Sequence, residues 1–178
     1  MFTFRKLLRA GALLGCSATV MVGTAQEQVK LGQAITEASL AEFDLIAAPG
    51  GSGFPDGSGT ARQGKKIFEN RCAACHGSNG EGYSAATLLV GGDMRSANSP
   101  LRTVGSYWPY SSTVFDFIRR AMPANAPKSL TNEETYQVAA YVLYLNGLVA
   151  EDEIMNAETL PRVRMPNAKG FIDKSHIH

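Results

Sequence analysis

The sequence predicts an all-α domain made of short helices and long irregular loops. Three segments, over about residues 60–71, 112–121 and 132–146, carry apolar residues at the i, i+3, i+4 spacing of amphipathic helices. A weaker helix is expected over about residues 36–44. The rest of the chain is rich in glycine, serine, asparagine and proline and shows no convincing strand pattern. A length of 178 residues suits one domain with extensions.

Capping and packing signals locate two of these helices. Thr131 and Glu134 have the T-x-x-E spacing of a capping box, which predicts a helix start at this point. Gly147 follows the last apolar residue of the same helix, as a C-terminal cap often does. Gly64 lies within the first helix, where glycine lowers stability, and it shares a helix face with Phe68. We therefore expect the last helix to approach the first one closely at Gly64.

The composition excludes several classes of protein. Lys+Arg number 17 and Asp+Glu number 16, so the net charge of +1 argues against nucleic acid as the main partner. Hydrophobic residues make up 44%, which is ordinary for a folded core and excludes a wholly disordered chain. No apolar run approaches the roughly 18 residues that a membrane-spanning helix needs.

Residues 1–25 have the pattern of a secretory signal peptide. Basic residues come first, an apolar stretch follows, and small residues stand at the expected cleavage site. We expect removal of this segment on export to the periplasm, which leaves a mature chain with a net charge near −2. An alternative involves Cys16, because Leu13-Leu14-Gly15-Cys16 resembles a lipoprotein signal. In that case a lipid on Cys16 would attach the protein to a membrane.

Residues 72–76 form a C-x-x-C-H sequence, which is the attachment signal for c-type haem. The thiols of Cys72 and Cys75 can each form a thioether with one vinyl group of haem, because residues three apart lie on one face of a helical turn. The imidazole of His76 then serves as an axial ligand of the iron. The sequence therefore predicts one covalently bound haem c.

Three other interpretations of the two cysteines are weaker. A thioredoxin-like dithiol requires a preceding strand, whereas the preceding segment is expected to be helical. A structural zinc site requires four ligands, and the other histidines, His176 and His178, stand at the extreme C-terminus. A disulfide between residues three apart would close a strained small loop.

Met122 is the expected second axial ligand of the iron, since methionine is the usual partner of histidine in electron-transfer cytochromes. Met122 follows the third segment of helix, and Pro123 and Pro127 stiffen the chain beyond it. Met165, which also precedes a proline, is the alternative ligand. The alternative role for Met122 is to fill a gap in the core. Two axial ligands leave no position for a substrate, so electron transfer is favoured over catalysis.

Several other residues are candidates for contacts with the haem. The indole N–H of Trp108 either donates to a haem propionate or belongs to plain core packing. Arg119 and Arg120 either pair with propionates, dock a partner, or form a solvated helix face. A backbone carbonyl within residues 87–89 is expected to accept the Nδ1 proton of His76.

These features together resemble class I cytochromes c, in which the first and last helices cross where a glycine and an aromatic residue meet. Residues 103–110, 115–123 and 125–131 further resemble the cytochrome subunits of bacterial sulfite and sulfane dehydrogenases. The resemblance extends over about residues 30–173. It implies the class I cytochrome c fold, with helices and irregular loops wrapped around one covalent haem c.

The resemblance divides the chain into four parts. Residues 26–59 would form an N-terminal extension after the signal peptide of residues 1–25. Residues 60–150 would form the monohaem domain, and residues 151–178 a C-terminal extension that packs on it.

The resemblance also implies a function. In such systems a molybdenum-cofactor subunit oxidises sulfite or sulfane sulfur, and the cytochrome passes the electrons to a downstream cytochrome c. Some relatives carry two haem domains, whereas this chain has a single C-x-x-C-H, so the substrate stays open. Two alternatives are an electron-transfer subunit of a different periplasmic dehydrogenase and a haem sensor with an open iron.

The motif predicts the effect of removing the thiols. Cys72→Ser and Cys75→Ser should each leave at most one thioether, and the double variant should lose all covalent haem. Haem staining after denaturing electrophoresis measures this directly. A double variant that keeps covalently bound haem would contradict the assignment.

Overall fold

The computed structural model describes residues 32, 34–41, 43–97, 100–172 and 174. It separates the chain into two units, Met1–Ile35 and Thr36–His178, and the folded domain belongs to the second. The expected signal peptide, with Cys16, lies outside the described residues, as do His176 and His178.

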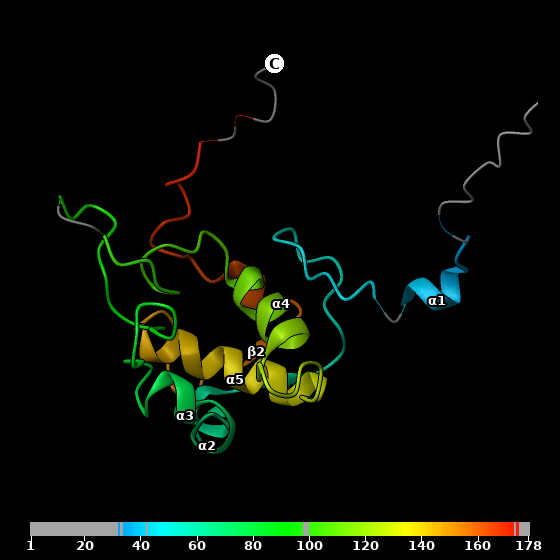
Figure 1. Cartoon of the computed structure of the whole chain (residues 1–178), viewed down its shortest axis with the longest axis horizontal. Helices are drawn as coiled ribbons and strands as arrows, with labels where there is room; N and C mark the ends of the chain where they lie inside the picture. The colour runs from blue at the N-terminus through cyan, green and yellow to red at the C-terminus, as the bar shows by residue number, and fades with distance from the viewer. Residues whose placement is uncertain (1–31, 33, 42, 98–99, 173, 175–178) are drawn as a thin grey trace, which may run out of the picture. The chain divides into compact units, whose positions relative to one another are not determined.

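The folded domain is mostly helical, as predicted (Figure 1). Three helices of 11 to 14 residues and several short elements make up the described chain, and α1 is shorter than the helix expected over residues 36–44. In chain order the elements are α1 (Glu37–Ala41), β1 (Ser58–Gly59), α2 (Ala61–Arg71), α3 (Ala73–His76), α4 (Ser111–Ala121), α5 (Asn132–Leu145), β2 (Met155–Asn156) and the 3-10 helix η1 (Leu160–Arg162).

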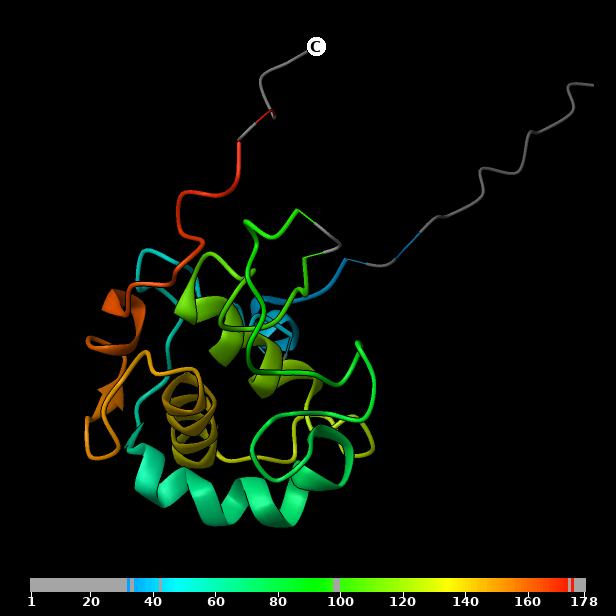
Figure 2. The same ribbon diagram turned by 90° about the vertical axis from the view of Figure 1, so that its left-hand side faces the viewer.

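Helices α2 and α5 cross in close contact at Gly64, as the sequence predicts. Figure 2 shows α2 passing across α5, which is seen nearly end-on. A Cβ atom at Gly64 would overlap the carbonyl oxygen of Gln137 on α5. Next to this contact, the fully buried ring of Phe68 lies 5.2 Å from the ring of Tyr141, between centroids. Only glycine lets the two backbones come this close.

Side-chain caps fix where α2 and α5 begin. At α5 the Thr131 hydroxyl accepts from the Glu134 N–H at 3.1 Å, and the Glu134 carboxylate accepts from the Thr131 N–H at 2.8 Å. This confirms the predicted capping box. Thr60 and Gln63 form a second capping box at the start of α2, with glutamine in the place that Glu134 takes in α5. Gly147, with a φ of 67°, ends α5 as expected.

A two-residue antiparallel pairing of β1 with β2 joins the chain before α2 to the chain after α5. Ser58 pairs with Asn156, and Gly59 pairs with Met155. The Met155 side chain is fully buried in the core. Strands this short carry no alternating pattern, so the sequence did not predict them.

The long segment between α3 and α4 contains no helix or strand among its described residues. Buried hydroxyls replace a strand ladder in part of it. Thr103 donates from its hydroxyl to the Gly91 carbonyl at 2.5 Å, and Ser106 donates to the Leu101 carbonyl at 2.6 Å. Each of these bonds satisfies a backbone acceptor in an irregular segment.

Within the described ranges, no helix combines the length and the apolar character that crossing a bilayer requires.

The crossing of α2 and α5 predicts a strong effect of one methyl group. Gly64→Ala should lower the free energy of unfolding by about 1–3 kcal/mol, because the Gln137 carbonyl must move to admit the new Cβ. Lys65→Ala, at an exposed position of the same helix, should change it by less than about 0.5 kcal/mol. Thermal unfolding of the two holoproteins makes the comparison. Equal stabilities would contradict the close crossing.

Candidate haem site

The imidazole of His76 is held in one orientation by the backbone. His76 ends the single turn α3, where its N–H donates to the Cys72 carbonyl at 3.0 Å. The Nδ1 atom of His76 lies 2.6 Å from the carbonyl oxygen of Thr87. A carbonyl oxygen only accepts, so Nδ1 carries the proton and Nε2 is the nitrogen left to bind a metal. The expected acceptor within residues 87–89 is therefore the carbonyl of Thr87.

A tight loop fixes the Thr87 carbonyl in place. The Thr87 hydroxyl accepts from the backbone N–H groups of Tyr83 and Ser84, both at 3.0 Å. The N–H of Gly82 donates to the His76 carbonyl at 2.6 Å, which joins the loop to α3. Gly82 has a φ of 60°, and a Cβ there would press on the backbone of residues 87 and 88. The sequence did not reveal these contacts, because they arise only when the loop folds back on α3.

The two motif cysteines have free thiols in different surroundings. Cys75 is exposed, whereas Cys72 is half-buried against the core. Burial raises the pKa of Cys72 to about 11, because a thiolate would lose its hydration there. The thiol is therefore neutral at physiological pH, and a neutral thioether sulfur suits the same position.

The two methionines considered as the second ligand lie in different environments. Met165 is 4% exposed and belongs to the core. Met122 caps the C-terminus of α4, where its N–H donates to the Ile118 carbonyl at 3.1 Å. Its side chain is half-buried at the edge of the core. Met122 is therefore the more accessible of the two residues, and its ligand role stays a prediction.

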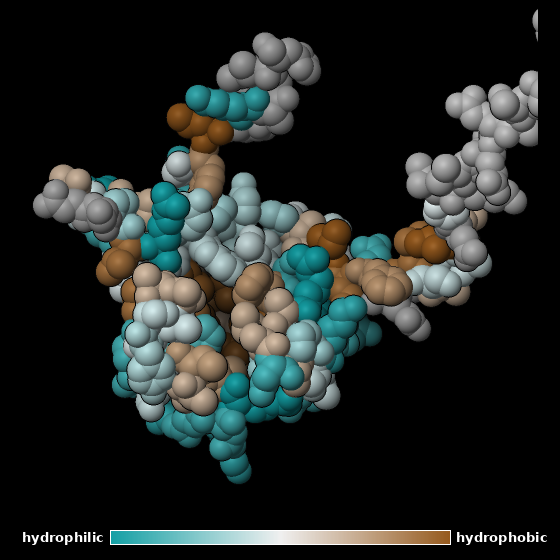
Figure 3. Space-filling view, viewed as in Figure 1, coloured by the Kyte–Doolittle hydropathy of each residue, from teal (hydrophilic) through white to brown (hydrophobic). Residues whose placement is uncertain are grey.

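An apolar hollow opens on one face of the domain. Figure 3 shows it over α5, between the loop that follows α3 and helix α4, with a hydrophobic floor. On α4 the ring of Phe117 remains 44% exposed, and the half-buried indole of Trp108 packs edge-on against it at 5.7 Å between centroids. Exposed apolar surface of this kind calls for a covering group. The free His76 nitrogen, the two neighbouring thiols and this surface all fit a haem.

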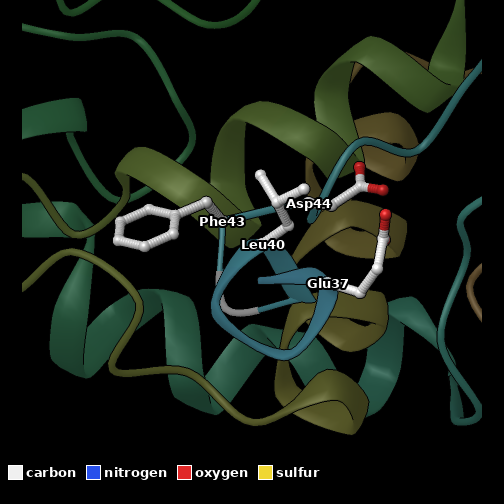
Figure 4. Close-up of a pocket in the computed structure, with 4 residues that line it drawn as sticks. All are labelled: Glu37, Leu40, Phe43 and Asp44. Carbon is white, nitrogen blue, oxygen red and sulfur yellow. The ribbon is translucent and has the colours of Figure 1, made fainter. Parts of the chain in front are cut away.

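Two other depressions lie away from the motif. One, of about 440 Å³, is lined by residues of α1 and the chain just after it, and Figure 4 shows them: Glu37, Leu40, Phe43 and Asp44. The other, of about 410 Å³, lies near η1 and is lined in part by Arg162 and Arg164. Neither includes a residue of the C-x-x-C-H sequence, so neither is the haem site.

Arg119 and Arg120 make contacts within the protein. Arg119 is half-buried and donates to the Leu45 carbonyl at 3.2 Å. Burial lowers its pKa, because desolvation disfavours the charged guanidinium. Arg120 pairs with Asp116 one helical turn earlier. The simple solvated helix face considered from the sequence is therefore wrong, at least for Arg119.

The arrangement of helices and loops is also found in a solved structure. A chain in the structure of the sulfane dehydrogenase SoxCD from Paracoccus pantotrophus matches with a TM-score of 0.75 and 37% sequence identity. The match covers 84% of this chain and 74% of that chain. The family model for cytochrome c matches residues 61–146, which contain the C-x-x-C-H and Met122. This chain belongs to the cytochrome c family.

Three curated relatives of this cytochrome c are thiosulfate dehydrogenases. The protein from Allochromatium vinosum is 34% identical over 94 residues, and the match covers 50% of this chain and 31% of that protein. The Stutzerimonas stutzeri protein is 31% identical over 49% of this chain and 28% of its own length. The Psychrobacter arcticus protein is 31% identical, and the match covers 55% of this chain and 31% of that protein. The chain thus spans about a third of the length of these relatives.

Membership of the family establishes the cofactor type and the general role. Cytochromes c carry covalently bound haem c and transfer electrons, and this chain has sulfur-dehydrogenase proteins among its relatives. Cys72, Cys75 and His76 are the residues that would hold the haem, and Met122 is the candidate sixth ligand. The assignment of each residue stays a prediction.

The contrast between the two methionines predicts separable variants. Met122→Ala should open the sixth position, permit carbon monoxide to bind the reduced protein, and lower the reduction potential. Met165→Ala should leave the iron closed and cost about 2–5 kcal/mol of stability, because it empties a core position. Absorption spectra with and without carbon monoxide separate the cases. If only Met165→Ala opens the iron, Met165 is the ligand.

Proposed function

We propose that this cytochrome c is a periplasmic electron carrier with one haem c. It accepts electrons from a molybdenum-containing subunit that oxidises sulfite or sulfane sulfur, and it passes them to another cytochrome c. The observation that carries the proposal is the 37% identity, over most of the chain, to part of a sulfane dehydrogenase. The single C-x-x-C-H supports one haem, and the secretory pattern of residues 1–25 supports export.

The haem supplies reversible one-electron redox chemistry when it is bound. The protein fixes the imidazole plane of His76 through the Thr87 carbonyl, which also makes the imidazole a stronger electron donor to a metal. Met122 supplies a neutral sulfur on a short stretch of chain that directly follows a rigid helix. The apolar hollow excludes water from the bound group. With His76 and Met122 both holding the haem iron, the site would transfer electrons and would leave no position for a substrate.

The division of the chain into parts belongs to the same proposal. Residues 60–150 form the haem domain, residues 26–59 an N-terminal extension, and residues 151–178 a C-terminal extension. Burial of Met155, Leu160 and Met165 supports packing of the last part on the haem domain. Trp108 is proposed as a donor to a haem propionate, which its half-buried position next to Phe117 supports.

A second candidate function is electron transfer for thiosulfate oxidation, which the three thiosulfate dehydrogenases favour. Because this chain spans about a third of those proteins, the rest of the activity would have to come from another polypeptide or domain. An open-iron haem sensor and a subunit for another type of dehydrogenase are the remaining alternatives. A methionine–iron charge-transfer band in the oxidised spectrum excludes the open-iron sensor.

Reduction experiments test the choice of electron donor. The oxidised protein should stay oxidised with sulfite or thiosulfate alone and become reduced when a periplasmic fraction containing the dehydrogenase is added. The protein that co-purifies should contain molybdenum by metal analysis. Stopped-flow absorbance follows the haem, and the Cys72→Ser/Cys75→Ser double variant is the control without bound haem. Rapid reduction by thiosulfate alone would contradict the proposal and favour a haem that reacts directly.

A further inference from the structure

A strap formed by residues 43–55 runs alongside α4 (Figures 1 and 2). Near its start, the N–H of Ala47 donates to Oδ1 of Asp116 at 3.0 Å, and Arg119 donates to the Leu45 carbonyl. At its end, the hydroxyl of Tyr136 donates to the Pro55 carbonyl at 2.9 Å. The strap is therefore fastened to the helices at two separate places.

The strap has a fixed shape between these two places. Ala48 donates from its N–H to the Ser52 carbonyl at 2.9 Å, which closes a tight turn. Gly53 has a φ of 78°, and a Cβ there would overlap the Ile46 carbonyl oxygen. Phe54 follows the turn and packs its ring 5.0 Å from that of Phe115 on α4, between centroids. These contacts hold the strap in one shape against α4.

Asp116 is the central group of the first fastening. It is 9% exposed, and its carboxylate accepts from the Ala47 N–H on one oxygen. The other oxygen accepts from Nε of Arg120 at 3.0 Å and from Nη2 at 2.5 Å. Hydrogen bonds to ionised groups are stronger than neutral ones, and removal of the carboxylate would leave the buried Ala47 N–H without its acceptor.

The strap meets the chain on both sides of Met122. Before it, Asp116, Arg119 and Arg120 occupy the last two turns of α4, which Met122 caps. After it, the ammonium of Lys128 lies 5.2 Å from the centre of the Phe43 ring, at the start of the strap. The cations considered from the sequence for docking a partner are thus engaged with the strap or with the residue that fastens it.

We propose that Asp116 is a positioning residue for the second axial ligand. By fastening the strap to α4, it restrains the chain on both sides of Met122 and so keeps the methionine sulfur from leaving the iron. This inference rests on the proposed ligand role of Met122. The two are distinguishable, because Met122→Ala tests the ligand and Asp116→Asn tests the restraint.

The decisive experiment measures how readily imidazole displaces the methionine in the oxidised holoprotein. Asp116→Asn keeps a similar shape, but its amide has a single acceptor oxygen and so cannot accept from both the Ala47 N–H and Arg120. It should raise the affinity for imidazole about tenfold, which is the scale expected from loss of one charge-assisted hydrogen bond. The loss of the methionine–iron charge-transfer band reports displacement. The reduction potential should fall in the same variant, because the sulfur is held less firmly.

Two further variants separate positioning from general stability. Met155→Ala empties a fully buried position in β2, so it should lower the melting temperature while imidazole affinity stays near that of the unchanged protein. Arg119→Met keeps the aliphatic stem but removes the bond to Leu45, and it should raise imidazole affinity as Asp116→Asn does. If Asp116→Asn yields no holoprotein, the imidazole affinity of Arg119→Met decides the test.

The possible results are clear-cut. The proposal is overturned if the imidazole affinity and the reduction potential stay unchanged in Asp116→Asn. If only Arg119→Met folds, the same result in that variant overturns it. Asp116 then has a purely structural role. If the unchanged protein lacks the charge-transfer band, or if Met122→Ala does not open the iron, Met122 is not the ligand. The proposal for Asp116 is then overturned together with that assignment.

Discussion

The contact between the backbones of α2 and α5 at Gly64 is the constraint on which the rest of the domain depends. It fixes one helix directly before the C-x-x-C-H sequence and another beneath the apolar hollow. Because α3 follows α2 after a single residue, the place where α2 is anchored sets where His76 lies. The core around Phe68 and Tyr141 then packs next to this contact.

Local signals explain why much of the fold was predictable. Amphipathic spacing located α2, α4 and α5, and the Thr131–Glu134 pair marked the first turn of α5. Such signals act within about one or two helical turns, so they are readable from neighbouring residues. The β1–β2 pair and the strap depend instead on residues far apart, such as Ala47 and Asp116, which are 69 positions apart. No local pattern carries that information.

The candidate site likewise combines features that are readable from neighbouring residues with contacts that only the fold creates. Five consecutive residues contain the whole attachment motif, so its chemistry is legible from the sequence alone. The acceptor for His76 could be narrowed to three residues, and the structure selects Thr87. The arginines beside Met122 were harder to interpret, because a basic pair on a helix suits a docking surface as well as an internal contact. Only the carboxylate of Asp116 and the Leu45 carbonyl distinguish these cases.

The short pairing of β1 with β2 has a consequence for how such a domain is used in larger proteins. It brings the chain just before α2 next to the chain just after α5, since Ser58 lies opposite Asn156. A domain whose two connections emerge side by side can be inserted into, or fused with, another polypeptide without disturbing its core. The thiosulfate dehydrogenases match this chain over about a third of their length, as expected of a portable electron-transfer module.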